Sequence, residues 1–146
     1  MNVGFIKDLY PDNFNEYDTD FWDNFIGKGT IYYRYLASLF DVYSNKLKYL
    51  VMVEQNNIIG IIVYGKVVHK NRYYIYLLAK KKGAHVKRVG ESLIIYLQNY
   101  LKSGCFMLID DSRIPNYYKN LGFKKSWGYV NCLFCEYQSY SYYKYF

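Results

Sequence analysis

Proline, cysteine and histidine are all scarce in this chain. Its 146 residues include 2 prolines, 3 cysteines and 2 histidines. An odd and small number of cysteines does not build a secreted disulfide framework, so we expect a reducing, intracellular setting: the cytoplasm, or a host cell if the source is a virus. Cys132 and Cys135 have the spacing of a metal pair, but residues three apart on a strand face opposite ways, and no second pair follows them. We therefore expect no metal site.

Long apolar runs and leader-like segments are missing as well. The longest apolar run, Ile58–Tyr64, is far shorter than the roughly 20 residues that a helix needs to cross a bilayer. The N-terminal stretch MNVGFIKDLY has no apolar core and no cleavage site. No Gly-x-Ser-x-Gly turn of the hydrolase kind occurs. We expect neither a membrane partner nor a targeting segment.

Hydrophobic residues, and above all tyrosines, are plentiful instead. Hydrophobic residues make up 52% of the chain, and 21 residues are tyrosine. This composition and length predict a single domain over residues 1–146 with one core. Two explanations of the tyrosines stay open: the codon bias of an AT-rich genome, or a tyrosine-lined binding surface.

Charge is distributed unevenly along the chain. Residues 1–45 carry 3 basic and 7 acidic side chains, a net charge of −4, whereas residues 46–146 carry 16 basic and 5 acidic ones, a net charge of +11. The two parts add up to the overall charge of +7. A basic body indicates an anionic partner, such as nucleic acid or a coenzyme that carries several phosphates.

The first third of the chain is predicted to hold one strand and two helices. We expect a short strand over Val3–Leu9. Steps of three and four residues between aromatic or apolar side chains predict one helix over Pro11–Phe25 and a second over Ile31–Tyr43.

The hydrophobic period then changes to that of strands. An antiparallel meander is expected, with turns at Asn56–Asn57 and His69–Asn71. Its three strands are predicted at Lys48–Glu54, Ile58–Val68 and Arg72–Ala79.

Helices and strands alternate in the rest of the chain. The apolar face of Val89–Leu101 gives the clearest helix, and the apolar run Cys105–Ile109 reads as a buried strand. Further elements are a short helix at Ile114–Leu121, a strand at Tyr129–Tyr137 and its partner at Lys124–Trp127; the last ten residues have no assignment. The order predicts an α/β fold, with a mixed, mostly antiparallel sheet of six or seven strands flanked by about four helices.

A strand, a basic loop and a helix start follow one another from Leu78 to Leu93. The loop contains Lys80-Lys81-Lys82 and continues to Lys87-Arg88. Free backbone N–H groups and the positive end of the helix dipole point into such a loop. A diphosphate would bind there, although a solvated basic loop before a helix would look the same in sequence.

A second segment adds specificity. Tyr118-Lys119-Asn120-Leu121-Gly122-Phe123 resembles the Y-x-x-L-G-F signature of the GNAT superfamily of N-acetyltransferases. The loop that ends in Gly90-Glu91-Ser92-Leu93 is similar to the pyrophosphate loop with which that family binds coenzyme A. The order of elements also matches, over roughly residues 47 to 137, so the resemblance implies a small, divergent, single-domain GNAT fold.

The resemblance implies acetyl-coenzyme A as the acyl donor, without a metal. The implied coenzyme-binding residues are Leu78, Ala79, Lys80, His85, Val86, Lys87, Arg88, Val89, Gly90 and Asp111. In the family, the strand matching Leu77–Lys80 splays from its neighbour at a bulge, and its main chain holds the pantetheine arm. Tyr118 matches the general acid that protonates the leaving thiolate.

The chain departs from the family pattern at three positions, two of them in the loop. His85 stands where Gln or Arg is expected, and Arg88 stands where the first Gly is expected. The Arg88 side chain either crowds the phosphates or pairs with them. Asp111 replaces an Asn that often precedes the second motif.

The general base and the acceptor stay open. Glu54, Asp110, His69 or a water molecule could accept the proton of the amine. The acceptor is expected to be a small-molecule or peptide amine. Acidic residues of the first helix region would favour a cationic one, unless they only form a solvated face: Asp12, Glu16, Asp18, Asp20 and Asp23.

The leading hypothesis is therefore an acetyl-coenzyme A-dependent N-acetyltransferase, as a monomer or homodimer. One alternative is a GNAT-fold pseudoenzyme that serves as a binding module, which the altered loop suggests. The other is a basic nucleic-acid-binding protein, because tyrosines beside lysines and arginines suit single strands. The chain has no recognisable nucleic-acid motif, so nucleic acid is not the expected partner.

Overall fold

The computed structural model describes residues 2–9, 14–26, 31–43, 46–67, 71–109, 116–131 and 136–146. The helices are α1 (Ile6–Leu9), α2 (Thr19–Asp23), α3 (Ile31–Tyr43), α4 (Val89–Leu101) and α5 (Tyr117–Asn120). The strands are β1 (Asn2–Phe5), β2 (Leu47–Glu54), β3 (Asn57–Lys66), β4 (Arg72–Lys80), β5 (Cys105–Ile109), β6 (Lys124–Asn131) and β7 (Glu136–Tyr145). In these residues, no helix has the length and apolarity needed to cross a bilayer.

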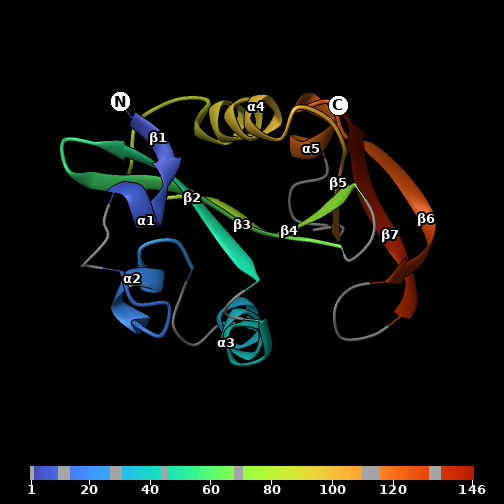
Figure 1. The fold of residues 1–146 in the computed structure, drawn as a ribbon, viewed down its shortest axis with the longest axis horizontal. Coiled ribbons are helices and arrows are strands. Elements are labelled where there is room, and N and C mark those ends of the chain that lie inside the picture. The colour runs from blue at the N-terminus through green and yellow to red at the C-terminus, as the bar shows by residue number, and fades with distance from the viewer. Residues whose placement is uncertain are drawn as a thin grey trace.

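The strands form one sheet in the order β1-β2-β3-β4-β5-β7-β6. Neighbouring strands are antiparallel except β4 and β5, which are parallel. Helices α4 and α5 cover one face of the sheet, and α2 and α3 cover the other (Figure 1). The predicted class, a mixed and mostly antiparallel sheet with helices on both faces, is confirmed; the described residues hold five helices where about four were expected.

Each face of the sheet has its own core. Alternate residues of a strand point to opposite faces, so Leu50 of β2 packs under α4 while Val51 packs under α2 and α3. Leu93 and Leu97 complete the α4 side, and Trp22 is the largest fully buried side chain of the other side. Burying each large apolar side chain contributes about 2 kcal/mol, so both layers hold the sheet in place.

The strongly periodic elements lie where the sequence predicts them. Helices α3 and α4 and strand β5 have the predicted bounds. The meander is also present, but the positive φ angles of its first turn fall on Gln55 (49°) and Asn56 (64°), one residue earlier than expected. Two residues with positive φ suit the twist of a two-residue hairpin.

The predicted helix over Pro11–Phe25 is wrong in extent, because only Thr19–Asp23 is helical. Asp18 stops the helix from extending backwards, since its side chain accepts a hydrogen bond from the Asp20 N–H at 3.0 Å and caps α2. The aromatic spacing reflects a cluster instead: the rings of Phe14 and Phe21 are 5.3 Å apart. Likewise, the strand expected over Val3–Leu9 ends at Phe5 and gives way to α1.

The predicted strand over Tyr129–Tyr137 is also wrong. That range spans the connection between β6 and β7, and the last residues, left unassigned above, form most of β7. β7 lies between β5 and β6 and buries Tyr142 completely. The short helix expected over Ile114–Leu121 is seen as α5, while the turn around His69 and the Cys132–Cys135 segment lie outside the described residues.

Candidate active site

The sheet opens between its two parallel strands. β4 and β5 pair only through Arg72 with Cys105, Tyr73 with Phe106, and Tyr74 with Met107. Both strands continue beyond this point, β4 as far as Lys80 and β5 as far as Ile109, without pairing to each other. The main chain of β4 therefore has a free edge on the side of β5, as the resemblance implied.

A β-bulge lies at the point of separation. On the β3 side, Tyr64 is opposite Ile75 and Val63 is opposite Leu77, so Tyr76 is an extra residue. Tyr76 and Leu77 consequently both pack on the α2 and α3 face, although neighbours in a regular strand alternate. The bulge bends β4 and re-aims its last residues, which is how sheets commonly open beside functional sites.

Helix α4 starts directly over the sheet because Gly60 of β3 has no side chain. A Cβ at this position would collide with Val89 and press on Leu93, at 3.2 Å from its Cδ1. Gly60 lies opposite Lys80, the last residue of β4. The missing side chain thus brings the first turn of α4 close to the free edge of β4.

The loop between β4 and α4 is fixed at its first residues. The Lys81 N–H donates to the Ile59 carbonyl and the Lys82 N–H to the Asn24 carbonyl, both at 2.8 Å. Gly83 then turns the chain with a φ of 79°. The side chains of Lys80, Lys82, His85, Lys87 and Arg88 are all exposed, so the loop presents positive charge to solvent.

The first turn of α4 has donors to offer. Arg88 is the N-cap residue, and its side chain makes no capping hydrogen bond. The Ser92 N–H bonds to the Arg88 carbonyl at 2.9 Å, and the N–H groups just before it have no partner within the helix. These donors, the helix dipole and the lysines fit a diphosphate well.

Arg88 adopts a left-handed backbone conformation, which glycine adopts with less strain than a residue with a side chain. Its φ of 59° is left-handed, which an L residue adopts at a cost of about 1 kcal/mol. The guanidinium extends into solvent with 81% of the side chain exposed, and its Nε lies 3.8 Å from Glu91 Oε2. The turn before α4 thus forms with arginine at this position, and the arginine side chain points away from the protein.

Two adjacent tyrosines of α5 pack against different parts of the protein. Tyr118 is buried, with its ring 5.2 Å from that of Tyr142 and 5.9 Å from that of Phe123. The Tyr117 hydroxyl lies directly against Gly90 of α4, where a Cβ would also approach Leu78 of β4 at 3.7 Å. Tyr117 thus joins α5 to the first turn of α4, and burial raises the pKa of its phenol, which stays protonated at neutral pH.

The glycine of the second motif also has a structural reason. Gly122 has a φ of 93°, and a Cβ there would meet the Lys144 side chain at 3.1 Å. Lys144 of β7 crosses this glycine and donates from Nζ to the Leu121 carbonyl at 2.8 Å. Burial lowers the pKa of Lys144. The contact ties α5, and with it Tyr118, to the sheet.

The structure brings most of the predicted site residues together at one end of the sheet. Leu78, Ala79 and Lys80 form the free edge, the loop and helix start follow directly, and α5 faces them. Asp111 and two of the candidate bases, Asp110 and His69, lie outside the described residues. Glu54 ends β2 at the hairpin.

The described acidic residues of the first helix region have structural partners, and Asp20 and Asp23 are among them. Asp18 caps α2, and Glu16 accepts a hydrogen bond from the Tyr49 hydroxyl at 2.6 Å. Burial, and then this hydrogen bond, raise the pKa of Tyr49. Asp12 lies outside the described residues.

Sequence reasoning missed Tyr117, Gly60 and Asn24. Nothing in the sequence distinguishes Tyr117 from the other tyrosines except that it directly precedes the second motif. Gly60 and Asn24 act through packing and a main-chain carbonyl, which leave no pattern in sequence. Among the described residues, no group of three histidine, cysteine or acidic side chains could hold a metal.

These features define the class of the protein. A mixed sheet that opens between two parallel strands, next to an uncapped helix start and a basic loop, is the architecture of an acyl-coenzyme A acyltransferase. The chain belongs to the acetyltransferase (GNAT) family, whose family model matches residues 7–123. The resemblance found in the sequence is thereby confirmed. Among curated proteins, none matches the sequence.

Solved structures show the same fold. Tetrahymena GCN5 is 15% identical with a TM-score of 0.70, over 99% of this chain and 96% of that one. An aminoglycoside 6′-acetyltransferase type Ii is 13% identical with a TM-score of 0.63, over 99% and 97%. The PaiA N-acetyltransferase of Thermoplasma acidophilum, crystallised with coenzyme A, is 16% identical with a TM-score of 0.51, over 100% of both chains.

Proposed function

We propose that this protein is an acetyl-coenzyme A-dependent N-acetyltransferase that passes the acetyl group directly to a primary amine. One observation carries the proposal: β4 separates from β5 at the Tyr76 bulge, beside the uncapped start of α4. A free strand edge and a diphosphate-binding turn at the same end of the sheet suit a ligand that is both extended and anionic.

The residues divide the binding between main chain and side chain. The main chain of Leu78, Ala79 and Lys80 would hold the extended arm and orient the thioester carbonyl. The turn from His85 through Val86, Lys87, Arg88 and Val89 to Gly90 would hold the diphosphate. Arg88 would pair with a phosphate oxygen, since its guanidinium is exposed beside the helix start. Asp111 is assigned to the arm by family resemblance alone.

The chemistry needs placement and one proton donor. When bound, acetyl-coenzyme A supplies an acetyl group that is already activated as a thioester. Holding the amine against that group provides much of the rate acceleration. As the carbon–sulfur bond breaks and the carbon–nitrogen bond forms, Tyr118 gives a proton to the departing sulfur and later regains one from solvent. The amine loses its proton to water or to a nearby carboxylate.

The acceptor is proposed to be a small cationic amine. Two of the similar structures are aminoglycoside 6′-acetyltransferases by name. The described acidic side chains Glu16, Asp18, Asp20 and Asp23 all belong to the segment around α2, which covers one face of the sheet. They would attract a cation to that face.

The test is thiol release from acetyl-coenzyme A by the purified chain. Spermidine, an aminoglycoside and an arylalkylamine without a second charge serve as acceptors, and we expect the two polycations to react fastest. A clear preference for the arylalkylamine would contradict the cationic acceptor but leave the transferase intact. Calorimetry with acetyl-coenzyme A separates the alternatives: binding without turnover on any amine would indicate a binding module, and absence of binding would overturn the proposal.

A further inference from the structure

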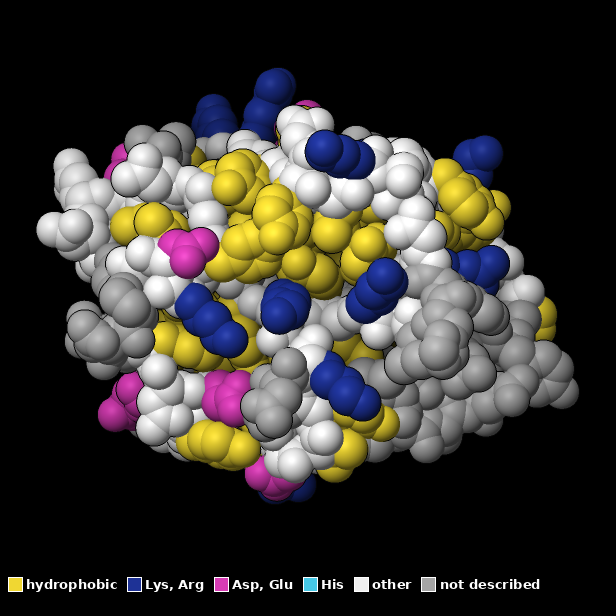
Figure 2. Space-filling view, in the orientation of Figure 1, with side chains coloured by type: hydrophobic (Ala, Val, Ile, Leu, Met, Phe, Trp, Pro, Cys, Tyr) yellow, Lys and Arg dark blue, Asp and Glu magenta, His cyan; other side chains and the backbone are white. Residues whose placement is uncertain are grey.

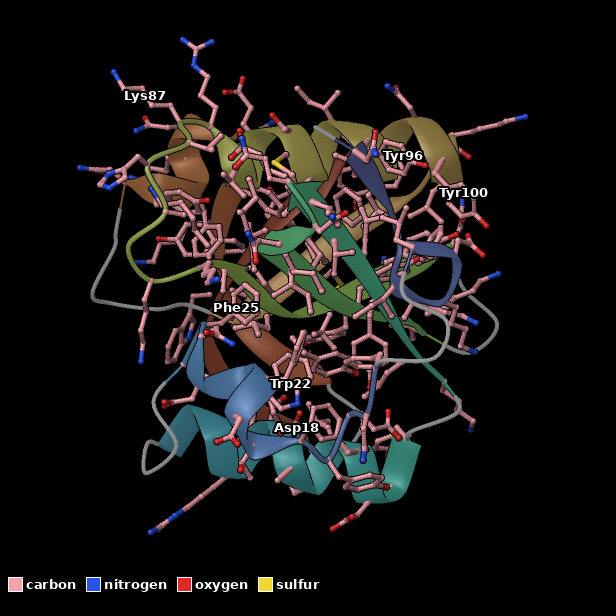
Figure 3. The ribbon with its side chains drawn as sticks, turned by 90° about the vertical axis from the view of Figure 1, so that its left-hand side faces the viewer. Asp18, Trp22, Phe25, Lys87, Tyr96 and Tyr100 are labelled. Atoms are coloured by element: carbon pink, nitrogen blue, oxygen red, sulfur yellow. The ribbon has the colours of Figure 1, made fainter. Side chains whose placement is uncertain are left out.

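A cavity lies at the far end of α4 from the candidate active site. Its volume is about 440 Å³, and its walls come from α1, the start of β2, the end of β3 and the last turn of α4. Neither the loop after β4 nor α5 contributes to its lining. Figure 3 shows Lys87 of the loop and Tyr100 of the cavity at opposite ends of the helix. The two sites are therefore separate.

Lysines and tyrosines alternate on the floor of this cavity. Lys48 of β2 lies opposite Tyr64 of β3 in the register of the sheet. Lys66 of β3 lies opposite Tyr73 of β4 in the same way. Tyr64 and Lys66 are two residues apart on one strand, so both point to the same face. We call this cavity the lysine–tyrosine pocket, after these four residues.

Aromatic rings line more than the floor. The rings of Phe5 and Tyr100 meet edge to face at 4.8 Å on one wall, and those of Tyr64 and Tyr73 at 6.2 Å below. Tyr100 is 58% exposed, so its ring is accessible to a ligand. Burial, and then the neighbouring Tyr100 and Tyr73, raise the pKa of Tyr64, so its hydroxyl stays neutral. The pocket thus offers the exposed Tyr100 ring to a flat ligand, whereas the rings of Tyr64 and Tyr73 are buried.

The charge of the pocket is strongly positive. Four lysines line it (Lys7, Lys46, Lys48 and Lys66) against the single carboxylate of Asp8, which gives a net charge of +3. All four are exposed, and none has an ion-pair partner in the part of the chain that the structure describes. Figure 2 shows a hydrophobic patch in the middle of the face turned to the viewer, with basic side chains along its lower border. Ammonium groups gathered in this way repel one another unless an anion lies between them.

We propose that the lysine–tyrosine pocket binds a free nucleotide, that is, a flat base carrying a phosphate. The base would stack on the exposed Tyr100 ring, and the phosphate would pair with Lys48 and Lys66. A purely apolar ligand would leave the lysines uncompensated, and a sugar phosphate would leave the rings uncovered. The volume is sufficient for one ligand of nucleotide size.

Uridine 5′-monophosphate is the probe, because it lacks the adenine of coenzyme A. Binding is measured by calorimetry on the full chain, with and without saturating acetyl-coenzyme A. We expect saturable binding in both conditions. The Lys48→Ala/Lys66→Ala variant should weaken it at least about tenfold, since two charge-assisted contacts are lost. The matched control, Lys119→Ala/Lys124→Ala, removes the same charge from exposed positions outside the pocket and should change the affinity less than about twofold.

Several results would overturn the proposal. Absence of binding at millimolar probe, equal losses in the two double variants, or displacement by acetyl-coenzyme A would each do so. Hexauridylate binding more than tenfold tighter than the mononucleotide would make the occupant a nucleic-acid strand rather than a free nucleotide. None of these measurements depends on acetyl transfer, so they stand apart from the outcome of the turnover assay.

Discussion

The two ends of α4 both present positive charge, but by different means. At the N-terminal end, the positive charge comes from main-chain N–H groups and the positive end of the helix dipole, with lysines around them. At the C-terminal end, the dipole is negative, and the lysine–tyrosine pocket relies on side chains alone. The helix has 13 residues, so the two ends are about 20 Å apart.

Ligand binding at the two ends of α4 should therefore respond differently to side-chain substitutions. A site built from backbone donors is expected to tolerate replacement of its side chains, such as those at positions 85 and 88. A site built from side chains is lost with them. Variants at the N-terminal end of α4 test this expectation through kcat, KM and the free energy of unfolding.

The largest effect is expected at Tyr118. Tyr118→Phe keeps the ring that packs on Phe123 and Tyr142 and removes only the hydroxyl, so the fold should be unchanged. Loss of a general acid lowers kcat by about 100-fold or more. The measurement is steady-state acetyl transfer. Tyr96→Phe, on the exposed side of α4, is the matched control and should keep full kcat.

Tyr117→Phe completes the comparison at this end of the helix. Its hydroxyl lies against Gly90, so its loss should alter the KM for acetyl-coenzyme A more than kcat. If the 100-fold loss of kcat appeared in Tyr117→Phe and not in Tyr118→Phe, the general acid would be Tyr117.

A moderate effect on stability is expected from the contact between Gly90 and Tyr117. Gly90→Ala puts a methyl group where the Tyr117 hydroxyl lies, which should cost about 1–2 kcal/mol of unfolding free energy. In the Tyr117→Phe background the hydroxyl is gone and the nearest ring carbon lies 3.2 Å from the added methyl group, so the cost should fall below about 1 kcal/mol. Urea unfolding of the four variants measures this coupling. Additive effects would show that the two residues are not in contact.

The smallest effect is expected from Arg88→Gly. Glycine relieves the left-handed backbone but gains entropy in the unfolded chain, so the free energy of unfolding should change by less than about 1 kcal/mol. The ion pair with Glu91 is exposed and contributes little. If Arg88 pairs with a phosphate, the KM for acetyl-coenzyme A should rise about fivefold, which corresponds to about 1 kcal/mol. A lower KM would mean that the side chain crowds the turn.

Elements with a strong local pattern could be predicted from the sequence, and elements that depend on pairing or clustering could not. Helices α3 and α4 could be predicted with their bounds, because a long amphipathic pattern determines both period and length. The segment before α2 could not, because its aromatic residues cluster through a turn held by Asn15, whose carbonyl accepts the Asp18 N–H at 3.0 Å. β7 was missed because its place between β5 and β6 is determined by pairing, which includes the distant strand β5, and not by its own composition.

The site divides in the same way. The place of the basic loop before α4 and of the short helix that contains Tyr118 could be predicted, because the patterns that indicate them are local. Contacts between distant segments determine three other features: the separation of β4 from β5, the packing of α4 against Gly60, and the position of Tyr117. None of them has a sequence pattern of its own.

The place of β7 also has a consequence for biosynthesis. Because β7 pairs with β5 on one side and β6 on the other, β6 has no place in the sheet until β7 has formed. While a ribosome is still making residues 136–146, β5 presents an open edge to other chains, which is a hazard for aggregation. The half of the sheet on which Tyr118 packs is therefore expected to fold only after translation of β7, in one late cooperative step. The meander of β1 to β4 can fold during synthesis.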